Sequence, residues 1–225
     1  MLYWLGRFYL WLVGWRMEGK PPDCNKFVLI AAPHTSNWDL PLMLSLASLY
    51  HLRIHWIGKH TLFRFPFGPF MRWTGGISVD RRSRGNTVEQ IVHEFQRRDK
   101  FALAVPVEGT RSRAECWKSG FYYIALEAHV PVVLGFLDYK RKVGGFGPSF
   151  MPTGNVEQDT KVLRDFYESI TPKYPECYGP IRFRPREEQT TQPPPGPAEA
   201  SEESLPKEQP PVENPPTPRQ PTSDS

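Results

Sequence analysis

The chain has 225 residues, with 28 Lys and Arg against 24 Asp and Glu, a formal net charge of +4, and three widely spaced cysteines, Cys24, Cys116 and Cys177. An odd number of scattered cysteines argues against a disulfide framework and against a C-x-x-C metal site, and it favours a reducing compartment. The length allows one domain of ordinary size and an appendage.

Residues 1–17 form the first predicted element, an apolar helix that contains six aromatic residues and is interrupted by Arg7. About 20 uninterrupted apolar residues are needed to cross a bilayer, so we expect a helix that lies at the membrane interface. A helix packed onto the domain core is the alternative. A secretory signal peptide is disfavoured, because the chain lacks a positively charged start and the Arg16 to Lys20 segment is no small-residue cleavage site.

Residues 26–33 are a short apolar run bounded by turn residues, which predicts a buried strand. His34 follows this run directly, and Asp39 comes five residues later. An Asp that accepts the Nδ1 proton of a His leaves Nε2 able to take a proton from a hydroxyl, as a general base does. A single His at a strand end is more often structural, so the hypothesis depends on what else reaches the same place.

The next segments continue the alternation of helices and strands. Residues 39–50 predict a buried Leu-rich helix, in which Met43 is interpreted as a core residue, and residues 54–58 predict a strand. Residues 61–72 form a link rich in Phe and Pro. We weigh two interpretations of this link equally: it flanks the substrate entrance and touches membrane, or it is an ordinary packed connection.

The second half of the chain repeats this alternation. Helices are predicted at 86–97, with Asn86 as its cap, at 119–129 and at 156–170, and strands at 101–107 and 131–137. The class is therefore α/β, with a largely parallel central sheet flanked by helices. A polar cluster, residues 108–113, follows a strand just as His34 does. Ligands of such sheets bind outside the carboxyl ends of the strands, so we expect one shared site.

Four segments resemble the sequence blocks of the glycerolipid acyltransferase superfamily, which includes the 1-acylglycerol-3-phosphate acyltransferases. They occur in the family's order: His34 to Asp39, Gly76 to Arg81, Glu108 to Arg111, and Val130 to Val133. The resemblance extends over roughly residues 27–175. This family transfers a fatty acyl group from a coenzyme A or acyl-carrier-protein thioester to a free hydroxyl, commonly that of a lysophospholipid.

The resemblance implies a role for each matching residue. His34 is the base and Asp39 its orienting carboxylate. Arginine pairs well with phosphate, so Arg81 and Arg111 are expected to hold the phosphate of the acceptor. Glu108 binds acceptor hydroxyls or neutralises the arginines in the empty site. The remaining predicted substrate-binding residues are Gly109 and Thr110 of the third block and the basic Lys59, with Lys118 as a further candidate.

A nucleophilic mechanism at Ser112 or Cys116 is the chemical rival, but neither residue has the flanking sequence of a known nucleophile motif. No metal and no cofactor is predicted, because the spacing of the His and carboxylate residues does not suggest ligation and the acyl thioester is a co-substrate. Arg82, Arg84 and the other histidines are expected to be solvated or structural: His51, His55, His60, His93 and His129.

The last 39 residues, 187–225, contain 11 prolines and eight acidic residues, and we predict that they form a disordered tail. Residues 1–186 then have 26 basic and 16 acidic residues, a net charge of +10. With no nucleic-acid-binding motif in the chain, this charge favours an anionic membrane as partner. The predicted parts are a membrane-associating helix at 1–20, an acyltransferase domain at 21–186 and the tail.

The sequence thus predicts an acyltransferase that acts at a membrane, peripheral or monotopic, with its active site on the cytoplasmic side. The expected acceptor is 1-acylglycerol-3-phosphate and the expected product phosphatidate. Two alternatives stay open: the same chemistry on another lysophospholipid or a lyso-aminolipid, and a membrane lipid-binding protein without turnover. Oligomeric state, acyl-chain length and the choice between the two donors cannot be predicted.

Overall fold

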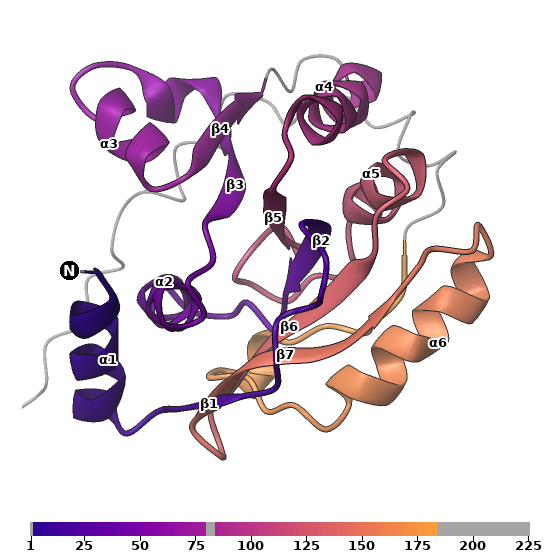
Figure 1. The fold of residues 1–225 in the computed structure, drawn as a ribbon. Helices are drawn as coiled ribbons and strands as arrows, with labels where there is room; N and C mark the ends of the chain where they lie inside the picture. The colour runs from indigo at the N-terminus through magenta and orange to yellow at the C-terminus, as the bar shows by residue number, and fades with distance from the viewer. Residues whose placement is uncertain (1, 80–83, 184–225) are drawn as a thin grey trace, which may run out of the picture. The chain divides into compact units, whose positions relative to one another are not determined.

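A computed structural model describes residues 2–79 and 84–183 of the chain (Figure 1). A seven-stranded sheet has the order β1-β7-β6-β2-β5-β3-β4, in which the β6–β7 pairing is antiparallel and the other five pairings are parallel. The predicted α/β class with a largely parallel sheet is confirmed. The strands are β1 (Arg16–Glu18), β2 (Lys26–Ala31), β3 (Ile54–Lys59), β4 (Gly76–Val79), β5 (Phe101–Pro106), β6 (Val132–Asp138) and β7 (Val143–Phe150).

Helices lie on both faces of this sheet (Figure 1). The face that carries α1 and α2 will be called the front face. On the other face lie α4, α5 and α6. The helices are α1 (Leu2–Val13), α2 (Asp39–Leu49), α3 (Gly68–Trp73), α4 (Arg84–Arg97), α5 (Gly120–Glu127) and α6 (Val156–Tyr167), with a 3-10 turn at His60–Phe63 that precedes α3.

Between their end residues the central strands β2, β5 and β6 are continuously apolar, and both of their faces are covered. In β2, Val28 and Ile30 pack toward α4, α5 and α6, whereas Phe27 and Leu29 pack toward α2. Burial on both faces explains why the central strands read as continuous apolar runs instead of alternating ones. The predicted strands at 26–33, 54–58, 101–107 and 131–137 correspond to β2, β3, β5 and β6.

Several predicted boundaries are wrong. The first helix ends at Val13 instead of residue 17, and residues 16–18 form β1, which pairs with β7. The N-terminal segment 1–20 therefore also contributes a strand to the sheet. Asn86 lies inside α4, which begins at Arg84, so it is not the cap of that helix. The last helix ends at Tyr167. Predicted features at 187–225 lie outside the described residues.

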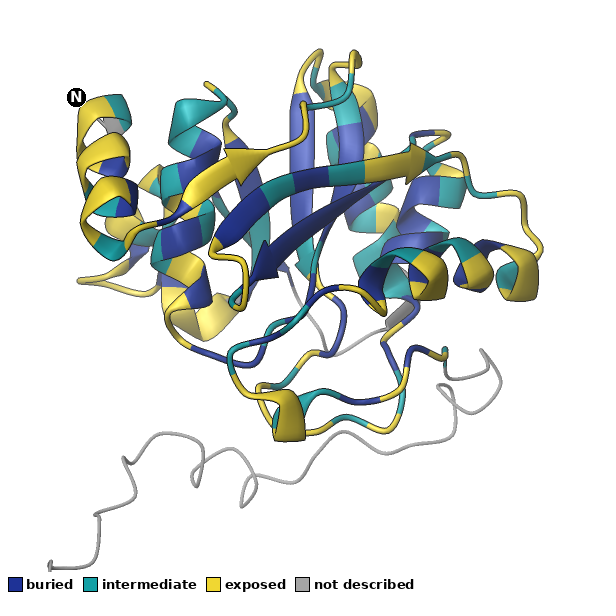
Figure 2. Ribbon diagram, turned by 90° about the horizontal axis from the view of Figure 1, so that it is seen from below, coloured by how far each residue is buried: buried dark blue, intermediate teal, exposed yellow. Residues whose placement is uncertain are grey.

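The N-terminal helix is partly buried and partly exposed. Leu10 is buried, as is Trp15 just after the helix, and together they pack with α2 residues Leu42 and Leu46. The opposite side of the helix exposes Trp4 and Trp11, and Figure 2 shows mostly exposed residues along its outer side. Within residues 2–79 and 84–183, no helix combines the length and the apolar content that crossing a membrane requires. Packing onto the domain and an exposed aromatic side therefore coexist in this helix.

Candidate active site

The His34–Asp39 pair lies where β2 leads into α2. His34 is in the loop three residues after β2, and Asp39 is the first residue of α2, so the chain turns back between them. Nδ1 of His34 lies 3.1 Å from Oδ2 of Asp39. The imidazole is partly exposed and the carboxylate is buried. This contact occupies Nδ1 and leaves the other ring nitrogen, Nε2, as the atom that can accept a proton from a bound hydroxyl.

Two further donors hold the Asp39 carboxylate. The backbone N–H of Ser36 donates to Oδ2 at 3.0 Å, and the hydroxyl of Tyr139 donates to Oδ1 at 2.5 Å. Burial, followed by the hydrogen bond to Asp39, raises the pKa of Tyr139 well above its ordinary value, so the phenol keeps its proton and remains a donor. Tyr139 follows β6 and is 100 residues from Asp39 in the sequence. Tyr139 is not predictable from the sequence as a partner of Asp39, because no local pattern connects residues this far apart.

A cation lies over the same phenol. Nζ of Lys173 is 6.0 Å from the centre of the Tyr139 ring, 5.3 Å from that of Trp38 and 5.5 Å from that of Tyr174. Ammonium groups at such distances are attracted to the negative faces of aromatic rings. The neighbouring backbone N–H of Tyr174 donates to Oγ1 of Thr35 at 3.2 Å, in the His34–Asp39 loop. The segment after α6 thus supports the loop that carries the pair.

We expect Tyr139→Phe to lower kcat about tenfold, because a hydrogen bond to a charged group contributes about 1.5–3 kcal/mol and Asp39 would lose one. With one donor fewer, the carboxylate would attract the imidazole proton more strongly, so the acidic limb of the pH–rate profile should move to higher pH. The KM for the acceptor should stay unchanged. Steady-state kinetics across pH measure all three quantities.

Tyr122→Phe is the matched control. Its hydroxyl donates to Oδ2 of Asp159 at 2.7 Å, which is the same kind of buried phenol–carboxylate bond in another part of the fold. Tyr122→Phe should lower the melting temperature and leave the pH–rate profile in place. If both variants left the profile in place, the Tyr139 hydroxyl would have only a structural role.

Glu108 reaches the site from the loop after β5. Its Oε1 accepts the backbone N–H of His34 at 3.2 Å, and the side chain is buried. Its other oxygen, Oε2, is buried without a hydrogen-bond partner among the described residues. Burial raises the pKa of Glu108 from 4.5 to about 7, with the nearby Asp39 carboxylate as a lesser contribution in the same direction. The carboxyl is therefore partly protonated at neutral pH and bonded to the loop that carries His34.

We expect the substitution Glu108→Gln to change how stability depends on pH. A raised pKa means that Glu108 contributes stability fully below about pH 4.5 and that this contribution is lost as the pH rises through about 7. Gln does not titrate. Going from pH 4.5 to 8, the free energy of unfolding of the variant should therefore rise relative to wild type by about 3 kcal/mol. Urea denaturation at both pH values measures it, and a pH-independent difference would contradict the assignment.

The remaining predicted substrate-binding residues are placed as follows. Gly109 has φ +67, and a Cβ there would come within 2.3 Å of Nζ of Lys118, so Gly permits both the turn and the close approach of Lys118. Oγ1 of Thr110 accepts the N–H of Ser112 at 3.2 Å, which stabilises the loop. Arg111 is exposed and lines the cavity described next. Lys59 ends β3, but its side chain, like all of Arg81, lies outside what is described.

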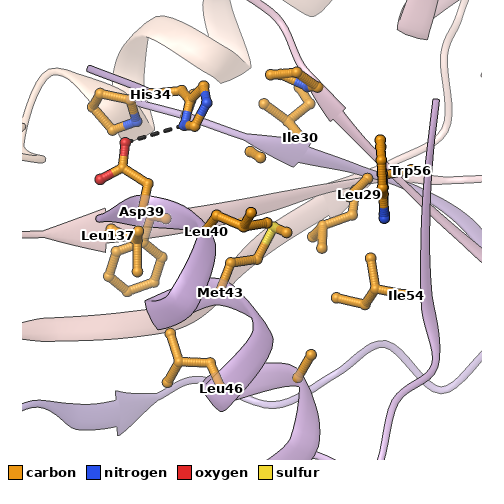
Figure 3. Close-up of a pocket in the computed structure, with 18 of the residues that line it drawn as sticks. Leu29, Ile30, His34, Asp39, Leu40, Met43, Leu46, Ile54, Trp56 and Leu137 are labelled. Atoms are coloured by element: carbon orange, nitrogen blue, oxygen red, sulfur yellow. Dashed lines mark ion pairs between the residues drawn. The ribbon is translucent and has the colours of Figure 1, made fainter. Parts of the chain in front are cut away.

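A largely apolar cavity of about 240 Å³ lies between α2 and the sheet. His34 and Asp39 give it a polar lining at one part (Figure 3), and Arg111 also lines the cavity. Met43 lines the cavity, so its interpretation as a core residue is incomplete. The apolar walls come from α2 and from strands β2, β3, β6 and β7, and they include Leu29, Ile30, Leu40, Met43, Leu46, Ile54, Trp56 and Leu137 (Figure 3).

The chain was compared with known proteins. A family model described as Acyltransferase matches residues 17–133. No curated protein matches the sequence. Among solved structures, the fold is similar to the crystal structure of the 1-acyl-sn-glycerophosphate (LPA) acyltransferase PlsC from Thermotoga maritima. The two share 21% sequence identity with a TM-score of 0.52, over 74% of this chain and 73% of that one. At this identity, the similarity concerns the fold.

Proposed function

The chain belongs to the acyltransferase family, and on that premise we propose that it moves a fatty acyl group from an acyl thioester to the free hydroxyl of 1-acylglycerol-3-phosphate, forming phosphatidate. The family membership confirms two predictions from the sequence: that the chain belongs to this acyltransferase superfamily, and that it is an acyltransferase enzyme. The acceptor, the donor and the roles of individual residues are the proposal. One observation carries it: the His34–Asp39 pair lies at an apolar cavity that Arg111 also lines.

In this mechanism His34 is the general base. Nε2 takes the proton of the acceptor hydroxyl while the hydroxyl oxygen attacks the thioester carbonyl carbon. The tetrahedral intermediate then collapses, the carbon–sulfur bond breaks, and the imidazolium returns its proton to the leaving thiolate. Asp39 stabilises the imidazolium that forms in between. A thiolate is a good leaving group, so one base beside a bound alcohol is sufficient and no acyl-enzyme is needed.

The polar residues around this pair suit the headgroup of the acceptor. Arg111 presents a guanidinium at the cavity, and such a group binds phosphate through two parallel hydrogen bonds. Arg81 and Lys59 are proposed to add positive charge. Glu108, with its raised pKa and its unpartnered Oε2, is proposed to bind the glycerol hydroxyl region while it holds the loop of His34 through Oε1.

The cavity suits the alkyl chain of the donor or of the acceptor. Its walls along α2 and β3 are apolar, and ligand pockets of this kind bind through buried apolar contact with few polar groups to fix orientation. Acyl-CoA or acyl carrier protein would supply the thioester, as a co-substrate and not as a resident cofactor. No metal is part of the proposed chemistry.

A lipid acceptor requires access to the bilayer, and the exposed side of α1 is proposed to supply it. Trp4 is 70% and Trp11 74% exposed, and Trp side chains favour the headgroup layer of a membrane. We place the protein at the membrane surface, peripheral or monotopic, with the site on the cytoplasmic side. The three cysteines, which are free thiols in the structure, are compatible with a reducing compartment.

The test measures the free thiol released from an acyl-CoA by purified wild-type protein in detergent. Release that requires lysophosphatidate, and that is much slower with the phosphate-free monoacylglycerol, supports the proposal. Equal turnover with other lysophospholipids or lyso-aminolipids would assign a different acceptor. If no thiol were released from either acyl-CoA or an acyl-carrier-protein thioester with any of these acceptors, the protein would be a lipid-binding protein without turnover.

A further inference from the structure

The Phe-rich segment, residues 60–73, exposes large apolar side chains to an unusual extent. Phe65 is 92% exposed and Trp73 64%, and the other exposed members are Leu62, Phe67 and Phe70. Single exposed apolar residues are normal on protein surfaces, but five within twelve residues form a patch, and large apolar patches mark interaction sites. The segment therefore presents a surface that needs a partner.

This exposure does not arise from a loosely attached segment. Phe63 is buried against Trp56, with ring centres 6.0 Å apart, and a Cβ on either Gly58 or Gly76 would come within 3.0 Å of the Phe63 ring. The backbone N–H of Gly68 donates to the carbonyl of Arg64 at 2.8 Å. One aromatic residue thus anchors the segment while its neighbours point outward. An ordinary packed connection would bury more of them.

The patch belongs to the front face of the sheet, which also carries α1 and α2. Trp56, against which Phe63 packs, lines the cavity on this face. Most exposed large apolar residues of the described chain belong to three segments: Trp4, Leu5, Phe8, Trp11 and Leu12 in α1, Trp38, Leu40 and Leu44 around the start of α2, and the five of the Phe-rich segment.

Residues 51–54 are contacted by α1 and by the residues that follow α3. The ring of Tyr3 in α1 stacks on His51 with the ring centres 5.2 Å apart. Three residues later, the carbonyl of Ile54 lies so close to Gly75, just after α3, that a Cβ there would come within 2.2 Å of it. The end of α3 and the start of α1 therefore adjoin the same short stretch, residues 51–54. The exposed apolar groups of α1 and of the Phe-rich segment flank this stretch.

The charge of this face selects the kind of partner. Residues 1–17 and 40–79 include no Asp or Glu, whereas their basic residues are Arg7, Arg16, Arg53, Lys59, Arg64 and Arg72. Aromatic residues interleaved with positive charge suit an anionic lipid surface, where the rings enter the headgroup layer and the cations meet phosphates. Protein interfaces mostly combine both signs of charge at their rim, whereas residues 1–17 and 40–79 carry only positive charge.

We propose that the Phe-rich segment is a second membrane-contacting surface, which inserts Phe65, Phe67, Phe70 and Trp73 into an anionic bilayer beside α1. Two contacts fix the orientation of the domain, whereas one helix would let it rotate about its anchor. With both in place, the cavity between α2 and the sheet lies in the layer next to the lipid. This proposal deepens the proposed function, because it rests on an acceptor that resides in the bilayer.

The test is the binding of the full chain to vesicles of neutral lipid and of neutral lipid mixed with anionic lipid, followed by flotation. We expect the variant Phe65→Ala/Phe67→Ala/Phe70→Ala to lower the partition coefficient at least about tenfold, because each ring withdraws apolar area from water on insertion. Met151→Ala is the control, since Met151 is 53% exposed and directly follows β7, which lies far from β3 and β4 in the strand order, and the variant should bind like wild type. Arg64→Gln should weaken binding to the anionic vesicles roughly fivefold and leave binding to the neutral vesicles unchanged. Lys161→Gln, which removes a positive charge from α6, is its control and should not weaken binding to either kind of vesicle.

The outcomes separate this proposal from the proposed function. Turnover of detergent-solubilised lysophosphatidate does not require vesicles, so the triple variant should keep wild-type thiol release in micelles while it loses vesicle binding. Suppose that wild type bound vesicles but showed no turnover, while the triple variant failed to bind them. In that case the membrane contact would stand and the proposed acceptor would be wrong. Vesicle binding unchanged in the triple variant would overturn the contact. If wild type formed a dimer, the triple variant were a monomer and both bound vesicles equally, the patch would instead bind a second copy of the chain.

Discussion

His34→Ala is expected to lower kcat/KM by about 10²–10⁴-fold, because general-base catalysis contributes a factor of this size and the substitution removes the proton acceptor at the cavity. The fold should persist, since the imidazole is partly exposed and its defined contacts are with Asp39 and, through the backbone, Glu108. Acceptor-dependent thiol release from acyl-CoA measures the effect, and thermal unfolding verifies the fold.

His93→Ala is the matched control for this loss. His93 is an exposed residue of α4, which lies on the face of the sheet opposite α2. It should retain the wild-type rate. If His34→Ala kept more than about a tenth of the wild-type kcat/KM in a folded protein, His34 could not be the base, since loss of a general base costs at least about 10²-fold. Ser112 and Cys116 would then be the next residues to substitute.

Asp39→Asn is expected to lower kcat about 10³-fold while the protein still folds, because Asn is nearly isosteric but carries no charge. The imidazolium formed during attack would lose the carboxylate that stabilises it at 3.1 Å. In one of its two orientations, the amide would also present an N–H to Nδ1 of His34. That contact favours the tautomer whose proton is on Nε2, which cannot accept the acceptor's proton.

The double variant His34→Ala/Asp39→Asn provides the sharpest check on this interpretation. Residues that act as one unit show effects far from additive, so the double variant should be no slower than His34→Ala alone. Asp165→Asn, in the exposed part of α6, should match wild type. If the two single losses multiplied in the double variant, Asp39 would act independently of His34, for instance on the acceptor or on the loop through Ser36 and Tyr139.

Central strands and amphipathic helices were predictable because their signals are local. The strands β2, β5 and β6 are continuous apolar runs between turn residues, and the apolar period of 156–170 marks α6, where Asn155 caps the helix by accepting the N–H of Gln158 at 3.2 Å. The contact of His34 with Asp39 was predictable from their spacing together with the strand before them and the other sequence blocks, because the turn from a strand into a helix is itself a local structure.

The peripheral strands were not predictable for the opposite reason. β7 (Val143–Phe150) contains three glycines and a proline, and β1 is three exposed residues long, so neither has strand propensity or an apolar pattern of its own. They become strands because the edge of β6 offers unpaired backbone groups to β7, and the other edge of β7 then offers its own to β1. Tertiary context, and not propensity, decides these elements.

The sequence by itself determined the family, the α/β class and the pairing of His34 with Asp39, since each depends on residue types at short spacings. The tertiary structure alone decided three things: that Tyr139, 100 residues away, donates to Asp39, that Glu108 is buried enough for its pKa to rise to about 7, and that α2 leaves a cavity over the sheet. Each depends on which distant atoms exclude water from a group or bond to it, and that is settled only when the helices close over the strands.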